Sequence, residues 1–275
     1  MHFIHPTAII HPKANIDNNV TIGPYSIIGQ NVIIRSQTVI GPHVIIDGNT
    51  YIGHNNKIYF GSSIGLEPQD LKYDGKSMGL TKIGDSNLIR EYVTIHRPTN
   101  ENEITEIKNN NLLMAYVHIA HNCQIDNNVV IANTVSLAGH VKVNYKAVIG
   151  GLSGIHQFVE IGSFAMIGGM SRIIKNVPPF VVAEGNPALI RSLNIVGLKR
   201  ANIYATKEYT YIQNVYNTLY KSGLYFKDAL EKIKQFANEN EYANIFYRFL
   251  LNSIQDESNS NKVRGLTPFY MKNRF

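Results

Sequence analysis

The chain has little of what supports many functional assignments from sequence. Its 275 residues include one cysteine, Cys123. A single cysteine excludes an internal disulfide and a cysteine-based metal cage, so zinc-finger and dithiol redox proteins are excluded as classes. No window approaches about 18 uninterrupted apolar residues, and the opening MHFIHPTAII lacks the charged start and apolar stretch of a secretory signal. We therefore expect a soluble cytoplasmic protein with no transmembrane segment.

Positive charge is concentrated toward the C-terminus. The net charge is +6, and residues 193–275 contain 12 Lys and Arg against 7 Asp and Glu. Such a basic region indicates an acidic partner, which could be nucleic acid, a membrane surface or an acidic carrier protein. A solvated helical surface is the alternative interpretation.

Isoleucine recurs every six residues, and this repeat dominates the sequence. The repeated isoleucines stand at positions 4, 10, 16, 22, 28, 34, 40, 46, 52, 58 and 64, then at 83, 89 and 95. From Ile107 to Ile173 an aliphatic residue keeps the same spacing. Six residues turn an α-helix by about 600°, so these side chains would spiral around a helix and share no face.

A coil of three short strands explains the repeat, with one aliphatic residue of each hexad pointing inward. The architecture that fits is a left-handed parallel β-helix whose coils stack about 4.8 Å apart. Glycine often follows the aliphatic residue, as at Gly23, Gly41 and Gly65. We expect these glycines at corners that need unusual backbone angles.

The repeat is interrupted twice and then ends. Residues 65–82 and about 96–106 have no hexad signal and contain turn-forming residues, so we expect loops there, on the binding face of the prism. We therefore assign residues 1–192 to the β-helix. Residues 193–275 have apolar residues at helical spacing and form a small α-helical domain. Within it, DESNSN, residues 256–261, is expected to be a turn or exposed loop.

Four histidines occupy related places in successive coils. Positions 119, 137 and 155 are one 18-residue coil apart, and near them stand His118, His121, His140 and His156. Stacked coils bring these side chains within about 10 Å of one another along the prism axis. Imidazoles could bind a metal or accept a proton from a hydroxyl that attacks an acyl carbonyl. Gly139 would lie directly above His121 and could offer its amide to an oxyanion.

The segment HIAHNCQIDNNVVIAN, followed by LAGHV, IGG, IHQF, IGGMS, NVPPF, GNPA and NIVGLKR, resembles one enzyme family. These are the UDP-N-acetylglucosamine 3-O-acyltransferases, which catalyse the first step of lipid A synthesis in Gram-negative bacteria. The likeness extends from HPTAIIHP through QDLKY and IREYVTIHR into the C-terminal region. It implies transfer of an (R)-3-hydroxyacyl chain from acyl carrier protein to the 3-position of UDP-N-acetylglucosamine. It also implies a homotrimer with active sites between neighbouring prisms.

The resemblance assigns roles to individual residues. His121 matches the general base and Gly139 the oxyanion amide. Residues expected to contact the sugar or the acyl donor are Gln69, Asp70, Lys72, His118, His140 and His156. Residues expected to hold the nucleotide diphosphate are Gln157, Asn194 and Arg200. Gly169 matches the residue that limits acyl-chain length. No metal and no cofactor are implied beyond the carrier protein's own phosphopantetheine, and the basic C-terminal surface would receive that protein rather than nucleic acid.

Some positions depart from the family pattern. Asn122 stands where the family commonly has Asp beside the base, and Pro187, Val196 and Ala201 replace His, Glu and Arg that help to bind the nucleotide. Loss of the carboxylate is more easily tolerated with an amine nucleophile, so N-acylation of the 3-amino sugar analogue is one alternative.

The sequence also leaves open a metal-dependent hydratase on the same fold, a non-enzymatic scaffold, and the later N-acyltransferase of the pathway. That N-acyltransferase carries an additional N-terminal uridine-binding domain. The repeat here begins at Ile4, so we do not expect such a domain.

Overall fold

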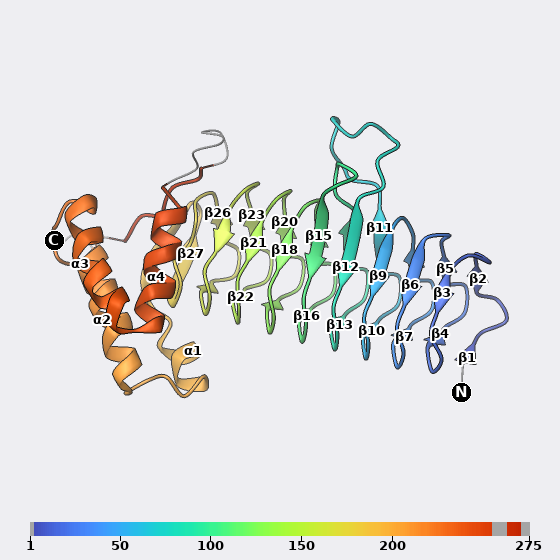
Figure 1. Ribbon diagram of the computed structural model, residues 1–275, viewed down its shortest axis with the longest axis horizontal. Coiled ribbons are helices and arrows are strands. Elements are labelled where there is room, and N and C mark those ends of the chain that lie inside the picture. Colours follow the sequence, from blue (N-terminus) through green and yellow to red (C-terminus); the bar gives the residue numbers. More distant parts are fainter. Residues whose placement is uncertain (1–2, 255–262, 271–275) are drawn as a thin grey trace.

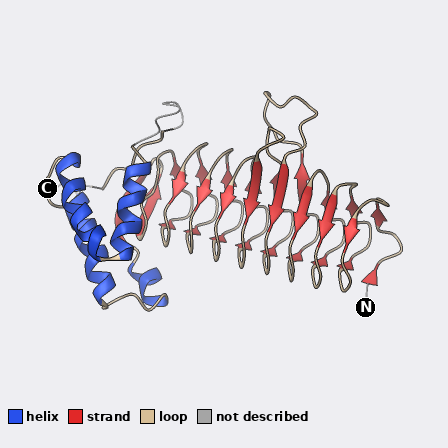
Figure 2. Ribbon diagram, in the orientation of Figure 1, coloured by secondary structure: helices blue, strands red, loops and turns tan. Residues whose placement is uncertain are grey.

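The computed structural model describes residues 3–254 and 263–270. Three parallel sheets form the faces of a long prism, with a helical bundle at one end (Figure 1, Figure 2). The architecture is a left-handed parallel β-helix, as the hexad repeat predicts, followed by helices, as the spacing of apolar residues after residue 193 predicts. The expected loop at residues 256–261 lies outside the described residues.

Each sheet collects every third short strand of the β-helix, and sheet A ends with the consecutive antiparallel strands β27 and β28. Sheet A contains β1 (Phe3–Ile4), β4 (Thr21–Ile22), β7 (Val39–Ile40), β10 (Lys57–Ile58), β13 (Leu88–Ile89), β16 (Leu112–Leu113), β19 (Val130–Ile131), β22 (Val148–Ile149), β25 (Met166–Ile167), β27 (Val181–Gly185) and β28 (Ala188–Leu193). Sheet B contains β2 (Ile9–Ile10), β5 (Ile27–Ile28), β8 (Ile45–Ile46), β11 (Ser63–Leu66), β14 (Thr94–His96), β17 (His118–Ile119), β20 (Ser136–Leu137), β23 (Gly154–Ile155) and β26 (Arg172–Ile173). Sheet C contains β3 (Asn15–Ile16), β6 (Val32–Ile34), β9 (Thr50–Ile52), β12 (Leu80–Ile83), β15 (Ile104–Ile107), β18 (Gln124–Ile125), β21 (Lys142–Val143) and β24 (Glu160–Ile161).

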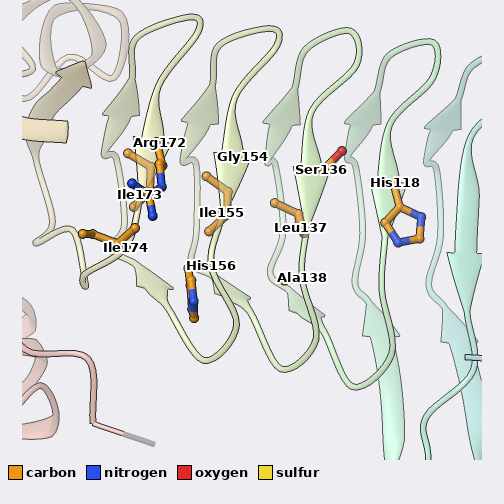
Figure 3. A pocket seen from close by; sticks show the side chains of 10 residues that line it. All are labelled: His118, Ser136, Leu137, Ala138, Gly154, Ile155, His156, Arg172, Ile173 and Ile174. Carbon is orange, nitrogen blue, oxygen red and sulfur yellow. The ribbon is translucent and has the colours of Figure 1, made fainter. Parts of the chain in front are cut away.

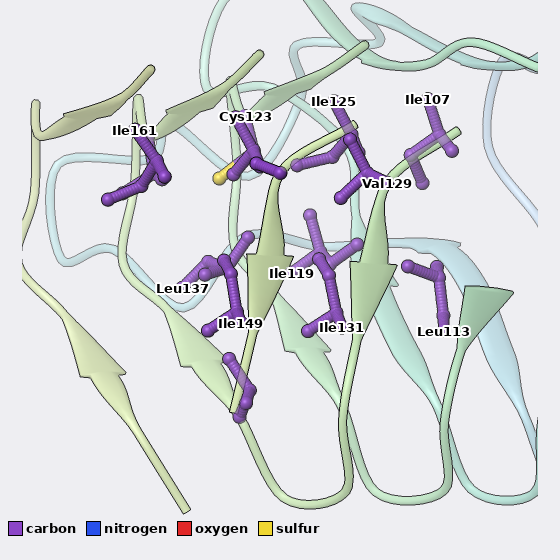
Figure 4. Close-up of a cluster of buried hydrophobic side chains, with 14 of the residues drawn as sticks. Ile107, Leu113, Ile119, Cys123, Ile125, Val129, Ile131, Leu137, Ile149 and Ile161 are labelled. Carbon is purple, nitrogen blue, oxygen red and sulfur yellow. The ribbon is translucent and has the colours of Figure 1, made fainter. Parts of the chain in front are cut away.

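The repeated aliphatic residues form the core of the prism. Ile119 pairs with Leu137, and Leu137 pairs with Ile155, so the three stack in sheet B. From Ile22 to Ile173 these side chains are almost completely buried. Figure 4 shows part of this cluster, between Ile107 and Ile161. Each fully buried aliphatic side chain contributes about 1.5–3 kcal/mol of transfer free energy. The isoleucine repeat therefore supplies the main driving force for coiling.

The corners of the prism correct the expectation about glycine at two of the three positions named for it. Gly23 and Gly41 have ordinary backbone angles; a Cβ atom on Gly23 would lie 2.8 Å from the carbonyl carbon of Gly41 in the next coil. Gly65 does have a left-handed backbone (φ 76°), as expected, but at most corners this conformation falls on the second residue, such as Asn122 (φ 62°) and His140 (φ 61°). The amide of His140 donates to the carbonyl of His121 at 3.0 Å. Hydrogen bonds of this kind between coils help to offset the cost of about 1–2 kcal/mol for a positive φ.

Both interruptions of the repeat are loops, but they are shorter than expected. The first loop spans residues 67–79 and projects from the prism between β11 and β12 (Figure 1). The second spans residues 97–103, between β14 and β15. Residues 80–82 and 104–106 belong instead to strands β12 and β15, which pair in register from Leu80–Ile104 to Ile83–Ile107. These residues form strands because β12 and β15 pair with each other, although they lack the hexad pattern.

The C-terminal region begins with the antiparallel hairpin β27–β28 and continues as helices. These are α1 (Ile195–Arg200), α2 (Lys207–Tyr220), α3 (Phe226–Glu239) and α4 (Glu241–Asn252). The apolar face predicted for the region is found on α2, where Ile212, Val215 and Tyr216 are buried. After α4 the chain returns to the prism, and the amide of Tyr270 donates to the carbonyl of Ile190 at 2.9 Å. None of the described helices is long and apolar enough to cross a membrane.

Candidate active site

Two adjoining cavities lie against sheet B, and both are lined by His118 and Ala138. The polar cavity has a volume of about 500 Å³, and its lining includes Gln69, Asp70, Lys72, His118, His121, Gly139 and Gln157. The apolar cavity has a volume of about 400 Å³ and extends along sheet B, past Ser136 and Gly154 to Arg172 (Figure 3). His156 also lines the apolar cavity. The structure therefore brings together most of the residues that the sequence singled out.

His121 is buried at the corner between sheets B and C. Its Nδ1 atom lies 2.8 Å from Oδ1 of Asn122. Its Nε2 atom lies 3.6 Å from Oδ2 of Asp70. Gly139 stacks on it so closely that a Cβ atom there would overlap the imidazole ring. Only a glycine fits above His121, which leaves the backbone of Gly139 beside the reactive side of the ring.

The contacts of Asn122 determine which nitrogen of His121 carries the proton. The Oδ1 atom of Asn122 accepts a hydrogen bond from the backbone amide of Thr99 at 3.3 Å. This contact identifies Oδ1 as the atom that faces His121, so Nδ1 of His121 donates to it. The Nε2 atom then carries its lone pair on the side of the polar cavity, where the carboxylate of Asp70 lies beyond hydrogen-bond distance, at 3.6 Å. This is the tautomer that a general base requires.

His140 and His118 pack beside His121 without forming a metal site. The ring of His140 lies edge-on to His121, with 5.2 Å between centroids, and stacks on Phe158 at 4.7 Å. The Nδ1 atom of His118 lies 2.7 Å from Oγ1 of Thr94. Among residues 3–254 and 263–270, no group of three His, Cys, Asp or Glu side chains is arranged to hold a metal ion.

Burial keeps two of the neighbouring histidines neutral. The pKa of His118 is lowered by burial and, to a smaller extent, by His121. Burial, followed by the nearby His118, His121 and Arg97, lowers the pKa of His96 to about 4. Burial also raises the pKa of Cys123 to about 12, so this thiol is not a nucleophile at neutral pH. His118 and His96 are therefore neutral imidazoles at neutral pH, and Cys123 is not a thiolate.

Arg97 fixes the loop that carries Asp70 and Lys72. This arginine is 6% exposed. Its Nη2 atom donates to Oε1 of Glu67 at 3.1 Å and to the hydroxyl of Tyr73 at 2.9 Å. The carboxylate of Asp70 also accepts from the amide of Lys72 at 2.9 Å. These contacts hold the first loop over the corner where His121 lies.

Besides His140, which packs on His121, three predicted site residues line neither cavity. Asn194 is buried and caps α1: its Oδ1 atom accepts from the amide of Gly197 at 2.9 Å, and its Nδ2 atom donates to the carbonyl of Phe164 at 2.8 Å. Arg200 is exposed in the last turn of α1. Gly169 is exposed at the corner between sheets A and B.

Sequence reasoning missed residues from distant segments that reach the site. Glu103 accepts a hydrogen bond from Nδ2 of Asn122 at 2.6 Å. Arg264, in the segment that follows the helices, donates from Nε to the carbonyl of Gln157 at 2.8 Å. Neither residue belongs to the hexad pattern. The stacking of coils therefore could not predict that either residue reaches the site.

Comparisons with known proteins agree with this architecture. Residues 104–139 match the model for bacterial transferase hexapeptide repeats, and residues 176–266 match the model for domain 2 of Udp N-acetylglucosamine O-acyltransferase. A curated acyl-[acyl-carrier-protein]--UDP-N-acetylglucosamine O-acyltransferase of Polynucleobacter asymbioticus is 55% identical over 84% of this chain and 87% of its own length. The corresponding protein of Thermodesulfovibrio yellowstonii is 49% identical over 86% of this chain and 91% of its own.

Solved structures give the same result. The UDP-N-acetylglucosamine acyltransferase of Francisella novicida matches with a TM-score of 0.90 and 36% identity, covering 97% of this chain and 94% of that one. The UDP-N-acetylglucosamine O-acyltransferase of Moraxella catarrhalis matches with a TM-score of 0.88 and 41% identity, covering 96% of this chain and 99% of that one. With this fold, this cavity and these relatives, the chain belongs to the acyl-[acyl-carrier-protein]--UDP-N-acetylglucosamine O-acyltransferase family.

Proposed function

We propose that this protein transfers an (R)-3-hydroxyacyl chain from acyl carrier protein to the 3-hydroxyl of UDP-N-acetylglucosamine, the first step of lipid A biosynthesis. The names of its relatives support the reaction, and one observation carries the mechanism. The lone pair of His121 Nε2 lies in a polar cavity, beside the carboxylate of Asp70 and against the backbone of Gly139. Such a site can deprotonate a sugar hydroxyl and stabilise the oxyanion that forms.

In the proposed reaction, His121 Nε2 accepts the proton of the 3-hydroxyl while the sugar oxygen attacks the thioester carbonyl carbon. The amide of Gly139 stabilises the oxyanion of the tetrahedral intermediate. Its collapse forms the ester and breaks the carbon–sulfur bond, and the phosphopantetheine sulfur takes the proton back from His121. The chemistry needs no cofactor beyond the phosphopantetheine that carries the acyl chain.

The remaining polar residues of the site hold the sugar nucleotide in this proposal. Gln69, Asp70 and Lys72 reach it from the first loop, His118 and His156 lie between sugar and acyl chain, and His140 keeps His121 in place. Gln157 and Arg200 bind the diphosphate. Because Oδ1 of Asn194 caps α1 and its Nδ2 is bonded to the carbonyl of Phe164 in the prism, this residue acts by placing the helix that carries Arg200.

The apolar cavity along sheet B receives the acyl chain. Its lining residues come from successive coils, from His118 to Arg172 (Figure 3). Gly169 lies at the corner that precedes β26, and Arg172 and Ile173 of β26 line this cavity. Gly169 would then leave space for a longer chain, and a larger residue would shorten it.

The protein acts as a cytoplasmic homotrimer in this proposal. An apolar stripe on sheet B supports self-association: Ile9, Ile27 and Ile45 pair in register and are 64%, 41% and 36% exposed. Carrier proteins of this kind are acidic, so the excess of Lys and Arg in residues 193–275 supports docking there.

The test is acyl transfer by the purified protein. UDP-N-acetylglucosamine and acyl carrier proteins of several chain lengths are the substrates, and mass spectrometry identifies the product. We expect an ester at O3, and we expect His121→Ala to lower kcat by about 10²–10⁴-fold with an unchanged circular dichroism spectrum. Failure of the wild type to acylate any sugar nucleotide would refute the proposal.

The same assay with the 3-amino sugar nucleotide addresses the N-acylation alternative. The relatives are named as O-acyltransferases, and Asn122 contacts a carboxylate in Glu103, so the motive for that alternative is weakened. A strong preference for the 3-amino sugar would show that the acceptor is the amine and not the 3-hydroxyl. Stoichiometric zinc or iron that is lost together with activity would favour the hydratase.

A further inference from the structure

Asn122 links the base to a carboxylate that lies outside the β-helix repeat. Its Oδ1 atom lies 2.8 Å from Nδ1 of His121, and its Nδ2 atom donates to Oε2 of Glu103 at 2.6 Å. Glu103 is the last residue of the second loop, just before β15. One amide group therefore separates the carboxylate from the imidazole.

The surrounding hydrogen bonds hold Glu103 in this position. Its backbone amide donates to the carbonyl of Asn100 at 3.2 Å, and its own carbonyl accepts from the amide of Leu80 at 3.2 Å. The hydroxyl of Thr99 donates to Oε2 at 3.3 Å. Burial alone would raise the pKa of Glu103, but hydrogen bonds from Asn122, Asn100 and Thr99, together with the charge of nearby His140, lower it overall. The carboxylate is therefore ionised at neutral pH.

An ionised carboxylate can only accept hydrogen bonds, and this property orients the amide of Asn122. The NH₂ group must face Glu103, so the carbonyl oxygen must face His121. His121 then carries its proton on Nδ1 and keeps Nε2 free. If the amide turned around, its NH₂ group would face Nδ1 and would favour the tautomer that cannot act as a base at Nε2.

Charge gives Glu103 a second influence on the reaction. When His121 accepts the proton of the sugar, the ring becomes a cation in a buried site. The negative charge of Glu103, reached through one polarisable amide, stabilises that cation. A carboxylate beside the imidazole has this role in catalytic triads. In this protein the carboxylate of Glu103 is separated from the imidazole of His121 by one residue, Asn122.

We propose that Glu103 is a positioning residue, and that the chain Glu103–Asn122–His121 takes the place of a carboxylate bonded directly to Nδ1 of His121. This inference rests on the proposed role of His121 as the base. It explains how Asn122 is compatible with transfer to a hydroxyl.

The first test is the conservative substitution Glu103→Gln. Glutamine has the same shape but no charge, and its amide can donate as well as accept, so Asn122 loses its fixed orientation. We expect kcat to fall on the order of tenfold, less than the loss on His121→Ala, with KM values unchanged within about twofold. Glu101→Gln is the matched control, because Glu101 is exposed in the same loop. An unchanged kcat in Glu103→Gln would overturn the inference.

The second test reverses the sign of the effect. Asn122→Asp places two carboxylates in contact. Their repulsion means that Glu103 should lower activity in this background. A glutamine at position 103 could instead donate a hydrogen bond to the new carboxylate. We expect Glu103→Gln to decrease kcat in the native background and to increase it in the Asn122→Asp background. A purely structural role for Glu103 predicts the same sign in both backgrounds, and that outcome would also refute the relay.

The third test does not depend on activity. Nitrogen-15 NMR of labelled histidine distinguishes the Nδ1–H and Nε2–H tautomers, and the His121→Ala spectrum assigns the signal of His121. We expect the Nδ1–H form in the wild type and a mixture in Glu103→Gln. An Nε2–H form in the wild type would refute the relay, whether or not acyl transfer occurs. Absence of transfer with the expected tautomer would instead refute the proposed function.

Discussion

The hydroxyl of Tyr73 accepts a hydrogen bond from the buried guanidinium of Arg97 at 2.9 Å. The same hydroxyl donates to the carbonyl of Ser77 at 2.9 Å, across the first loop. One phenolic group therefore closes the loop on itself and ties it to β14 through the residue that follows this strand. Since the loop carries Asp70 and Lys72 to the polar cavity, its attachment controls the site.

Removal of that hydroxyl should loosen the loop without unfolding the prism. Tyr73→Phe is expected to raise the KM for the sugar nucleotide several-fold and to lower the free energy of unfolding by about 1–3 kcal/mol, because a bond to a charged donor is lost. Steady-state kinetics and urea titration measure the two effects. Tyr59→Phe is the matched control, since an arginine also stacks on Tyr59, but on sheet A. Equal effects in the two variants would contradict the assigned role of the loop.

Gly139→Ala should displace the base. The added Cβ atom would overlap the ring of His121, and forced overpacking of this kind costs about 1–3 kcal/mol. We expect kcat to fall at least about tenfold, because the base requires close geometry. In the His121→Ala background the ring is absent, so the same substitution should have little effect on the melting temperature. A similar loss of stability in both backgrounds would mean that the clash lies elsewhere.

Acid should destabilise the protein partly through His96. Burial, His118, His121 and Arg97 lower the pKa of His96 in the folded protein from 6.5 to about 4. The unfolded chain therefore takes up a proton between these pH values that the folded protein refuses, and the contribution of His96 to stability is lost as the pH falls from 6.5 toward 4. His96→Gln should flatten the dependence of the urea midpoint on pH in this window. His43→Gln, at an exposed corner, is the control, and an identical pH dependence in both variants would count against the prediction.

Enlarging Gly169 should shorten the preferred acyl chain. A Cβ atom built on Gly169 meets only backbone atoms of Gly151, the nearer at 3.3 Å, so a side chain can extend from the corner. Gly169→Met is expected to shift the ratio of kcat/KM values toward shorter acyl donors, and Gly169→Ala to have a smaller effect in the same direction. Competition between acyl carrier proteins of different chain length measures the ratio. An unaltered preference in both variants would remove Gly169 from the acyl path.

The fold was more predictable than the detail of the corners. The six-residue spacing of isoleucine determines which side chains face inward, because one slip in register would expose all of them. The same spacing predicted that Ile119, Leu137 and Ile155 stack. It did not predict that residues 80–82 and 104–106 pair as strands. Each of these two segments forms a strand because the other lies beside it, and neither follows the hexad pattern.

The sequence alone determined the prism, the order of its coils and the place of His121 next to Gly139, because these follow from a local period that repeats along the chain. Only the tertiary structure decided what surrounds the base. Glu103 and Asp70 come from loops that leave the repeat, and Arg264 returns to Gln157 from beyond the helices. Contacts between such segments depend on where each loop folds back in space, and no periodic pattern in the sequence records that position.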